Sequence, residues 1–131
     1  MNIDPINWSK KIEDSGAGEV VLTSVNKEGL MNGFDNYLVN KIQKKIKIPV
    51  VVHGGAGRFK DIFDVLNLKN VHGIMIAGML HYHYLNFTSL NCKTKIGNTE
   101  FLKNFKKRNV KKNYIVKLKK YLKIKNINVR L

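Results

Sequence analysis

Glycine-rich turns follow three apolar stretches of this 131-residue chain, and turns of this kind can bind phosphate. Gly29 lies in the loop after the first stretch, the second ends in the sequence from His53 to Gly57, and the third ends in Ala77 and Gly78. Backbone N–H groups in such turns are not obstructed by side chains, and a following helix adds the positive end of its dipole. Two such turns after neighbouring strands predict a phosphate pocket. The alternative is that the glycines serve turn geometry alone.

Three polar side chains near these turns could also act on a ligand. Thr23 can hydrogen-bond a ligand or satisfy the loop backbone, and His53 can act as an acid or base or be a structural residue at the rim. A carboxylate at Glu28 would repel a phosphate, so we expect it to accept from backbone N–H groups or from a ligand hydroxyl. The residues predicted to bind phosphate or substrate are Thr23, Glu28, Gly29, His53, Gly54, Gly55, Ala77 and Gly78.

The remaining histidines do not suggest a metal site. His81 and His83 lie two residues apart without a third ligand, and His72 precedes a strand at the opposite end of the expected sheet. We therefore expect no metal and no cofactor, and we assign no catalytic residue.

A repeat of strand, loop and helix positions these residues. Its spacing predicts right-handed βαβ units and a parallel sheet, whose near-continuous apolar strands should be covered on both faces. The expected strands are Glu19–Val25, Pro49–His53 and Gly73–Ala77. The expected helices begin at the Asp4-Pro5 pair, at Asp35, at Phe59 and at Gly78. Trp8 and Tyr37 are expected on buried helix faces.

The C-terminal part of the chain differs in composition. A loop is expected from Asn86 to Asn98, then basic amphipathic helices over Thr99–Arg108 and Asn113–Lys125, and then a short strand or extended tail over Asn126–Leu131. We interpret the chain as one domain, with barrel-type units over residues 1–85 and a basic segment over residues 86–131.

The net charge of +15 is concentrated in that segment. From Lys93 onward there are fourteen Lys or Arg and one acidic residue, Glu100. The excess is nearly all Lys, whereas specific recognition of bases and phosphates relies on Arg. A solvated lysine surface is therefore favoured over a nucleic-acid contact, with an acidic protein partner as the alternative. The sequence contains no apolar run long enough to span a membrane, and its single cysteine, Cys92, is typical of a cytoplasmic protein.

Several motifs give the chain a resemblance to a known family. They are Gly16-Ala17-Gly18-Glu19, Leu22-Thr23-Ser24, Gly33-Phe34-Asp35 and His53-Gly54-Gly55-Ala56-Gly57. Together they resemble the C-terminal half of the cyclase subunit of imidazole glycerol phosphate synthase, a lyase of histidine biosynthesis. The resemblance implies part of a (β/α)8 TIM barrel, a glutaminase partner that supplies ammonia, and a bis-phosphorylated ribulosyl ribonucleotide as substrate. It also implies that Gly29, Gly55, Ala77 and Gly78 line a phosphate site, with Thr23 and His53 facing the reaction centre.

The chain departs from that family in three ways. Glu28 stands where Asp is usual, His53 where Ser is common, and Gly78 where Ser is usual. The two catalytic Asp of the family, on the first and fifth strands, have no counterpart here, so we expect the chain to be inactive without a complementary half-barrel or an oligomeric partner. Two alternatives stay open: a cyclase-like partner of a sugar amidotransferase in surface-polysaccharide biosynthesis, and a non-catalytic phosphate-binding half-barrel. We also expect Gly55→Asp to weaken phosphate binding.

Overall fold

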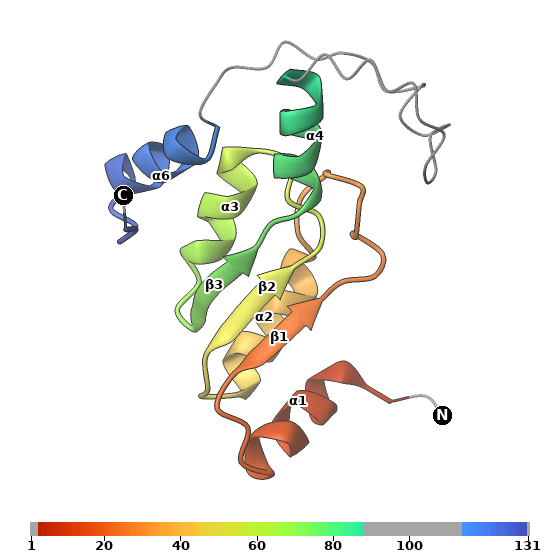
Figure 1. The fold of residues 1–131 in the computed structure, drawn as a ribbon. Helices are drawn as coiled ribbons and strands as arrows, with labels where there is room; N and C mark the ends of the chain where they lie inside the picture. The colour runs from red at the N-terminus through yellow and green to blue at the C-terminus, as the bar shows by residue number, and fades with distance from the viewer. Residues whose placement is uncertain (1–2, 88–113, 131) are drawn as a thin grey trace.

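A computed structural model describes residues 3–87 and 114–130 (Figure 1). Its elements are α1 (Pro5–Asp14), β1 (Val20–Thr23), α2 (Asn36–Lys45), β2 (Val50–His53), α3 (Phe59–Leu66), β3 (Val71–Met75), α4 (Gly78–Phe87) and α6 (Tyr114–Ile124). The strands form one parallel sheet in the order β1-β2-β3. The predicted α/β class and repeated strand–helix units are therefore confirmed, and the chain has the architecture of a partial TIM barrel.

The sheet brings the ends of its three strands to one edge. Thr23 is in register with His53, and His53 with Met75, so these residues form a row across the carboxyl ends of the strands. Strands β1 and β2 are shorter than the sequence predicted, whereas β3 has its predicted length but begins and ends two residues earlier. The row places the loops after β1, β2 and β3 side by side, as phosphate binding by neighbouring turns requires.

Aspartates begin the first two helices, as predicted. The Asp4 carboxylate accepts hydrogen bonds from the backbone N–H groups of Ile6 and Asn7, with Pro5 at the first helical position. Asp35 accepts from the backbone N–H of Leu38 at 3.0 Å. Each carboxylate satisfies donors that a helix N-terminus leaves without partners.

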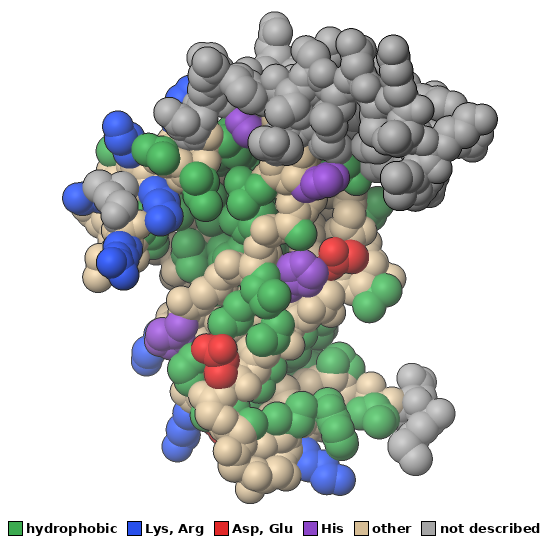
Figure 2. All heavy atoms as spheres, in the orientation of Figure 1, with side chains coloured by type: hydrophobic (Ala, Val, Ile, Leu, Met, Phe, Trp, Pro, Cys, Tyr) green, Lys and Arg blue, Asp and Glu red, His purple; other side chains and the backbone are tan. Residues whose placement is uncertain are grey.

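One face of the sheet is covered and the other is open. Leu22, Val50 and Val52 point to the helices and are at most 9% exposed. Val21 and Met75 point the other way and are 54% and 49% exposed. In Figure 1, α2 lies behind the sheet and no described helix lies in front of it, and Figure 2 shows hydrophobic side chains uncovered along that front face. The prediction that both faces are covered is therefore wrong for this chain, because all its described helices leave the second face bare.

Two helix faces also differ from the prediction. Trp8 and Tyr37 are 44% and 72% exposed, whereas Ser9 and Val39 are buried. Ser9 directly follows Trp8, and Val39 lies two residues after Tyr37, so each aromatic ring lies at the border of the buried helix face rather than within it. Aromatic rings at the border of a helix face can be placed on either side by apolar spacing alone.

The C-terminal elements agree with the sequence in part. Helix α6 lies within the predicted range and packs through Leu118 and Leu122, but Ile115 on its predicted apolar face is 50% exposed. Helix α4 extends to Phe87, past the predicted start of the loop. Residues 127–130 form no strand.

The expected helix over Thr99–Arg108 and the residue Cys92 lie outside the described residues. Lysine and arginine side chains gather around α6 in Figure 2. Among the described residues, no helix is long and apolar enough to span a membrane.

Candidate phosphate-binding site

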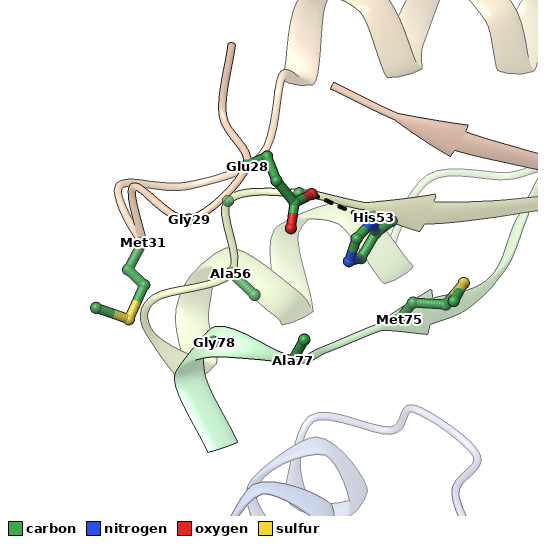
Figure 3. A pocket seen from close by; sticks show the side chains of 10 residues that line it. Glu28, Gly29, Met31, His53, Ala56, Met75, Ala77 and Gly78 are labelled. Carbon is green, nitrogen blue, oxygen red and sulfur yellow. Dashed lines mark ion pairs between the residues drawn. The ribbon is translucent and has the colours of Figure 1, made fainter. Parts of the chain in front are cut away.

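A small pocket lies at the carboxyl ends of the strands (Figure 3). Its lining is Glu28, Gly29, Met31, His53, Gly54, Gly55, Ala56, Met75, Ala77 and Gly78. Seven of the eight residues predicted to bind phosphate or substrate line it, and the eighth, Thr23, lies beside it and contacts His53. The cavity of about 20 Å³ is of the size that an ordered water molecule needs, so a larger ligand would extend into the open side of the pocket.

The glycines after β2 allow the loop after β1 to approach closely. A Cβ atom at Gly55 would lie 2.3 Å from the carbonyl oxygen of Gly33, and one at Gly57 would lie 1.9 Å from that of Met31. Gly54 and Gly55 also have φ values of +91° and +107°. The packing of the two loops therefore requires these glycines, in agreement with the alternative that they serve turn geometry. Glycine content alone does not identify an anion site.

Free backbone donors are a stronger sign of an anion site than glycine content. Among the described residues, the backbone N–H groups of Gly55, Ala56 and Gly57 have no protein acceptor. At the start of α4, the N–H groups of Gly78 and Met79 also have no acceptor among the described residues, whereas those of Leu80 and His81 donate to the carbonyl oxygen of Ala77. Gly55, Ala56 and Gly78 line the same pocket, so residues with unpaired backbone donors from two neighbouring strand ends lie around it.

The helices at this edge of the sheet differ in how their N-termini are satisfied. Asp35 caps α2, and the carboxylate of Asp61, only 8% exposed, accepts from the backbone N–H of Arg58 at the start of α3 at 2.8 Å. Helix α4 has no acidic residue in its first turn. The positive dipole end of α4 is therefore not offset by a carboxylate from its own first turn.

A short network of polar side chains flanks the pocket. Nδ1 of His53 lies 3.3 Å from Oε2 of Glu28 and 3.3 Å from Oγ1 of Thr23. The His53 side chain is 22% exposed and that of Glu28 is 46% exposed. Figure 3 shows Glu28 reaching from its loop toward His53 at the end of β2. The carboxylate therefore pairs with an imidazole, a partner that the sequence did not suggest for it.

Three lining residues were not predicted. Met75 could have been found, because strand alternation places it in register with His53 on the same sheet face. Ala56 lies within the glycine-rich turn and contributes its backbone. Met31 has a φ of +51°, and no signal in the sequence marks it.

The other histidines lie away from this pocket. His72 is at the amino end of β3, where its Nδ1 lies 3.2 Å from the carbonyl oxygen of Asn70. The rings of His81 and His83 contact Tyr82 and Tyr114, respectively. Within residues 3–87 and 114–130, no three His, Cys, Asp or Glu side chains are grouped so that they could hold a metal ion.

The aspartates of the described chain serve helix ends and ion pairs. Asp4, Asp35 and Asp61 accept from backbone N–H groups at helix starts. Asp14 and Asp64 pair with lysines one helical turn away. No described strand therefore ends in an aspartate that faces the pocket.

Comparison with known proteins extends the sequence resemblance. Residues 1–86 match the model of a family described as histidine biosynthesis protein. The chain is 41% identical over 80 residues to the imidazole glycerol phosphate synthase subunit HisF of Methanocaldococcus jannaschii, a match that covers 61% of this chain and 29% of that protein. It is 43% identical over 79 residues to the subunit HisF of Prochlorococcus marinus strain MIT 9515, covering 60% and 31% of the two chains. For the subunit HisF of Hydrogenobaculum sp. strain Y04AAS1, the identity is 34% over 97 residues, with 74% and 38% covered. The match thus spans 29–38% of the length of these relatives.

Proposed function

The chain belongs to the histidine biosynthesis protein family, and on this premise we propose that it supplies one phosphate-binding site of an imidazole glycerol phosphate synthase cyclase. The observation that carries the proposal is the meeting of free backbone donors from the turn after β2 with the uncapped N-terminus of α4. Such an arrangement binds the dianion of a phosphate monoester. The matched region contains the whole pocket.

In this proposal the substrate is the bis-phosphorylated ribulosyl ribonucleotide implied by the family resemblance. The chain binds one of its two phosphates, and the reaction uses ammonia from a glutaminase partner. Three strands cannot close a barrel. In this proposal the remaining strands, together with the acid and base residues, come from outside these 131 residues.

A direct test begins with binding. The 131-residue chain, labelled with ¹⁵N, is titrated with sulfate and with inorganic phosphate while backbone amide resonances are followed. The proposal expects saturable shifts at Gly55, Ala56 and Gly78. A titration that leaves these amide resonances unshifted would contradict the proposed phosphate site.

The second step tests turnover. The chain is mixed with the N-terminal two thirds of the Methanocaldococcus jannaschii relative, ammonia and the ribonucleotide substrate, and formation of imidazole glycerol phosphate is measured. Each polypeptide alone is the control. Turnover only in the mixture supports the cyclase, whereas phosphate binding without turnover favours the non-catalytic phosphate-binding half-barrel.

A further inference from the structure

The pocket contains one side chain that can become a cation. His53 and Glu28 are the two titratable side chains of its lining, and the lining includes neither Lys nor Arg. A phosphate bound there would therefore lie near the Glu28 carboxylate, and none of the described lining residues carries a permanent positive charge to offset it. The charge state of His53 then decides how well the pocket accepts a dianion.

The contacts of His53 define which of its nitrogens carries hydrogen. A carboxylate has no hydrogen to donate, and a lone pair on Nδ1 would be repelled by Oε2 of Glu28 at 3.3 Å, so this contact favours hydrogen on Nδ1. The hydroxyl of Thr23, at 3.3 Å from the same nitrogen, can accept as a second partner. With hydrogen on Nδ1, a neutral ring presents a lone pair at Nε2, and only the imidazolium presents an N–H there.

The second ring nitrogen is turned toward the pocket. Figure 3 shows it facing the space bounded by Ala56 and Ala77, on the side of the ring away from Glu28. The described groups around His53 are Thr23 from β1, Met75 from β3, the turn after β2 and the start of α4, and Glu28 is the one charged side chain among these described residues. A ligand at the free backbone donors would therefore meet Nε2 directly.

We propose that His53 binds the phosphate of the ligand as an imidazolium, held through Nδ1 by Glu28 and donating from Nε2, so that anion binding takes up one proton. This rests on the proposed phosphate site and names the side chain that makes the site selective for a dianion. The imidazolium adds a charge-assisted hydrogen bond to the neutral backbone donors. The opposite charges of the imidazolium and the Glu28 carboxylate make the pair neutral, which offsets the repulsion of the carboxylate from the phosphate.

Calorimetry with sulfate as the probe tests the proton uptake. Sulfate has no titrating proton near neutral pH, so any proton taken up on binding belongs to the protein. Binding of sulfate to the 131-residue chain is measured at pH 7.5 in two buffers of different ionisation enthalpy. We expect a buffer-dependent enthalpy that corresponds to proton uptake, and the His53→Gln variant should bind about tenfold more weakly without uptake. His72→Gln, at the opposite end of the sheet, is the matched control and should keep both the affinity and the uptake.

A measurement on the unaltered chain tests the same proposal even if the His53→Gln variant does not fold. The ring protons of His53 should shift on sulfate addition toward the values of a protonated imidazole. If the amides of Gly55 and Gly78 respond to sulfate while the His53 ring and the buffer dependence do not, the role of His53 is overturned and the site remains. If those amides do not respond, the phosphate site itself is overturned.

Discussion

The backbone N–H of Gly33 donates a hydrogen bond to the carbonyl oxygen of Gly55 at 2.9 Å. The contact joins the loop after β1 to the turn after β2 and leaves no room for a side chain at residue 55, because a Cβ there would lie 2.3 Å from the carbonyl oxygen of Gly33. The two loops therefore form one packed unit, and the pocket forms where this unit meets α4.

Gly55→Ala should unfold the chain more readily. Both the clash with Gly33 and the φ of +107° oppose a side chain, so we expect a loss of about 2–5 kcal/mol in the free energy of unfolding, measured with urea. Gly29→Ala is the matched control: its φ of +73° is also left-handed, but nothing lies within 4 Å of the added Cβ. It should cost about 1 kcal/mol. Equal losses in the two variants would contradict the packed contact.

The same contact changes the interpretation of a charged residue at this position. The sequence suggested that Gly55→Asp would weaken phosphate binding by charge. The structure shows that any side chain there first displaces the Gly33 backbone, so loss of binding in this variant would not report on charge. A charge test needs a lining residue with space around it.

Gly78 provides that test. It is the first residue of α4, and an added Cβ would lie 3.6 Å from Tyr82, an ordinary contact. Gly78→Asp should weaken sulfate binding about tenfold, and Gly78→Ser should strengthen it severalfold by adding a hydroxyl donor, with Gly78→Ala as the steric reference. Because an acidic residue at a helix N-terminus favours the helix, the Asp variant should not lose stability in urea. Weak binding together with lost stability would contradict the assignment.

Much of the fold was accessible from the sequence. The Asp4-Pro5 pair and Asp35 predicted helix starts correctly, because an aspartate side chain can accept from the free backbone N–H groups of a helix N-terminus using only local sequence. The repeat spacing predicted parallel strands, and neighbouring parallel strands bring their following loops together. The glycine-rich turns therefore indicated the pocket before its geometry was known.

Pairings between distant residues were not accessible. Glu28 lies in the loop after β1 whereas His53 ends β2, and Glu13 accepts hydrogen bonds from residues 34 and 35 positions away in the chain. Local patterns contain no information about which distant loop a carboxylate meets. The exposed sheet face was not predicted for a related reason. An apolar strand indicates that both of its faces pack against other elements, but not whether those elements belong to this chain.

Glu13 joins the end of α1 to the residues just before β2 by hydrogen bonds, and these contacts should depend on pH. Its carboxylate accepts from Lys10 Nζ at 2.7 Å and from the backbone N–H groups of Lys47 and Ile48 at 2.6 and 3.1 Å. The hydrogen bond from Lys10, followed by that from Lys47, lowers the pKa of Glu13 from 4.5 to about 2. The ionised form is thus favoured in the folded state, so its contribution to stability is full above about pH 4.5 and is lost as the pH falls toward 2.

The fluorescence of Trp8, the single tryptophan of the chain, reports on α1. We expect a transition in this fluorescence between about pH 4.5 and 2, and a weaker dependence in that range for Glu13→Gln. Asp14→Asn is the control, since that exposed carboxylate pairs with Lys10 but not with the backbone of residues 47 and 48. An unchanged acid transition in Glu13→Gln would show that Glu13 does not hold the helix.

The uncovered face of the sheet should make the isolated chain associate with itself. Val21 is 54% exposed at the centre of a parallel strand, a setting in which both faces are normally buried, and the outer edges of β1 and β3 are unpaired in the described structure. We expect light scattering to show a mass above that of the monomer, and Val21→Lys to lower it by placing a charge on that face. Val116→Lys makes the same chemical change at a residue of α6 that is 44% exposed, and it should leave the mass unchanged. If the unaltered chain is a folded monomer, the open face needs no cover; if both variants lower the mass equally, association proceeds through another surface.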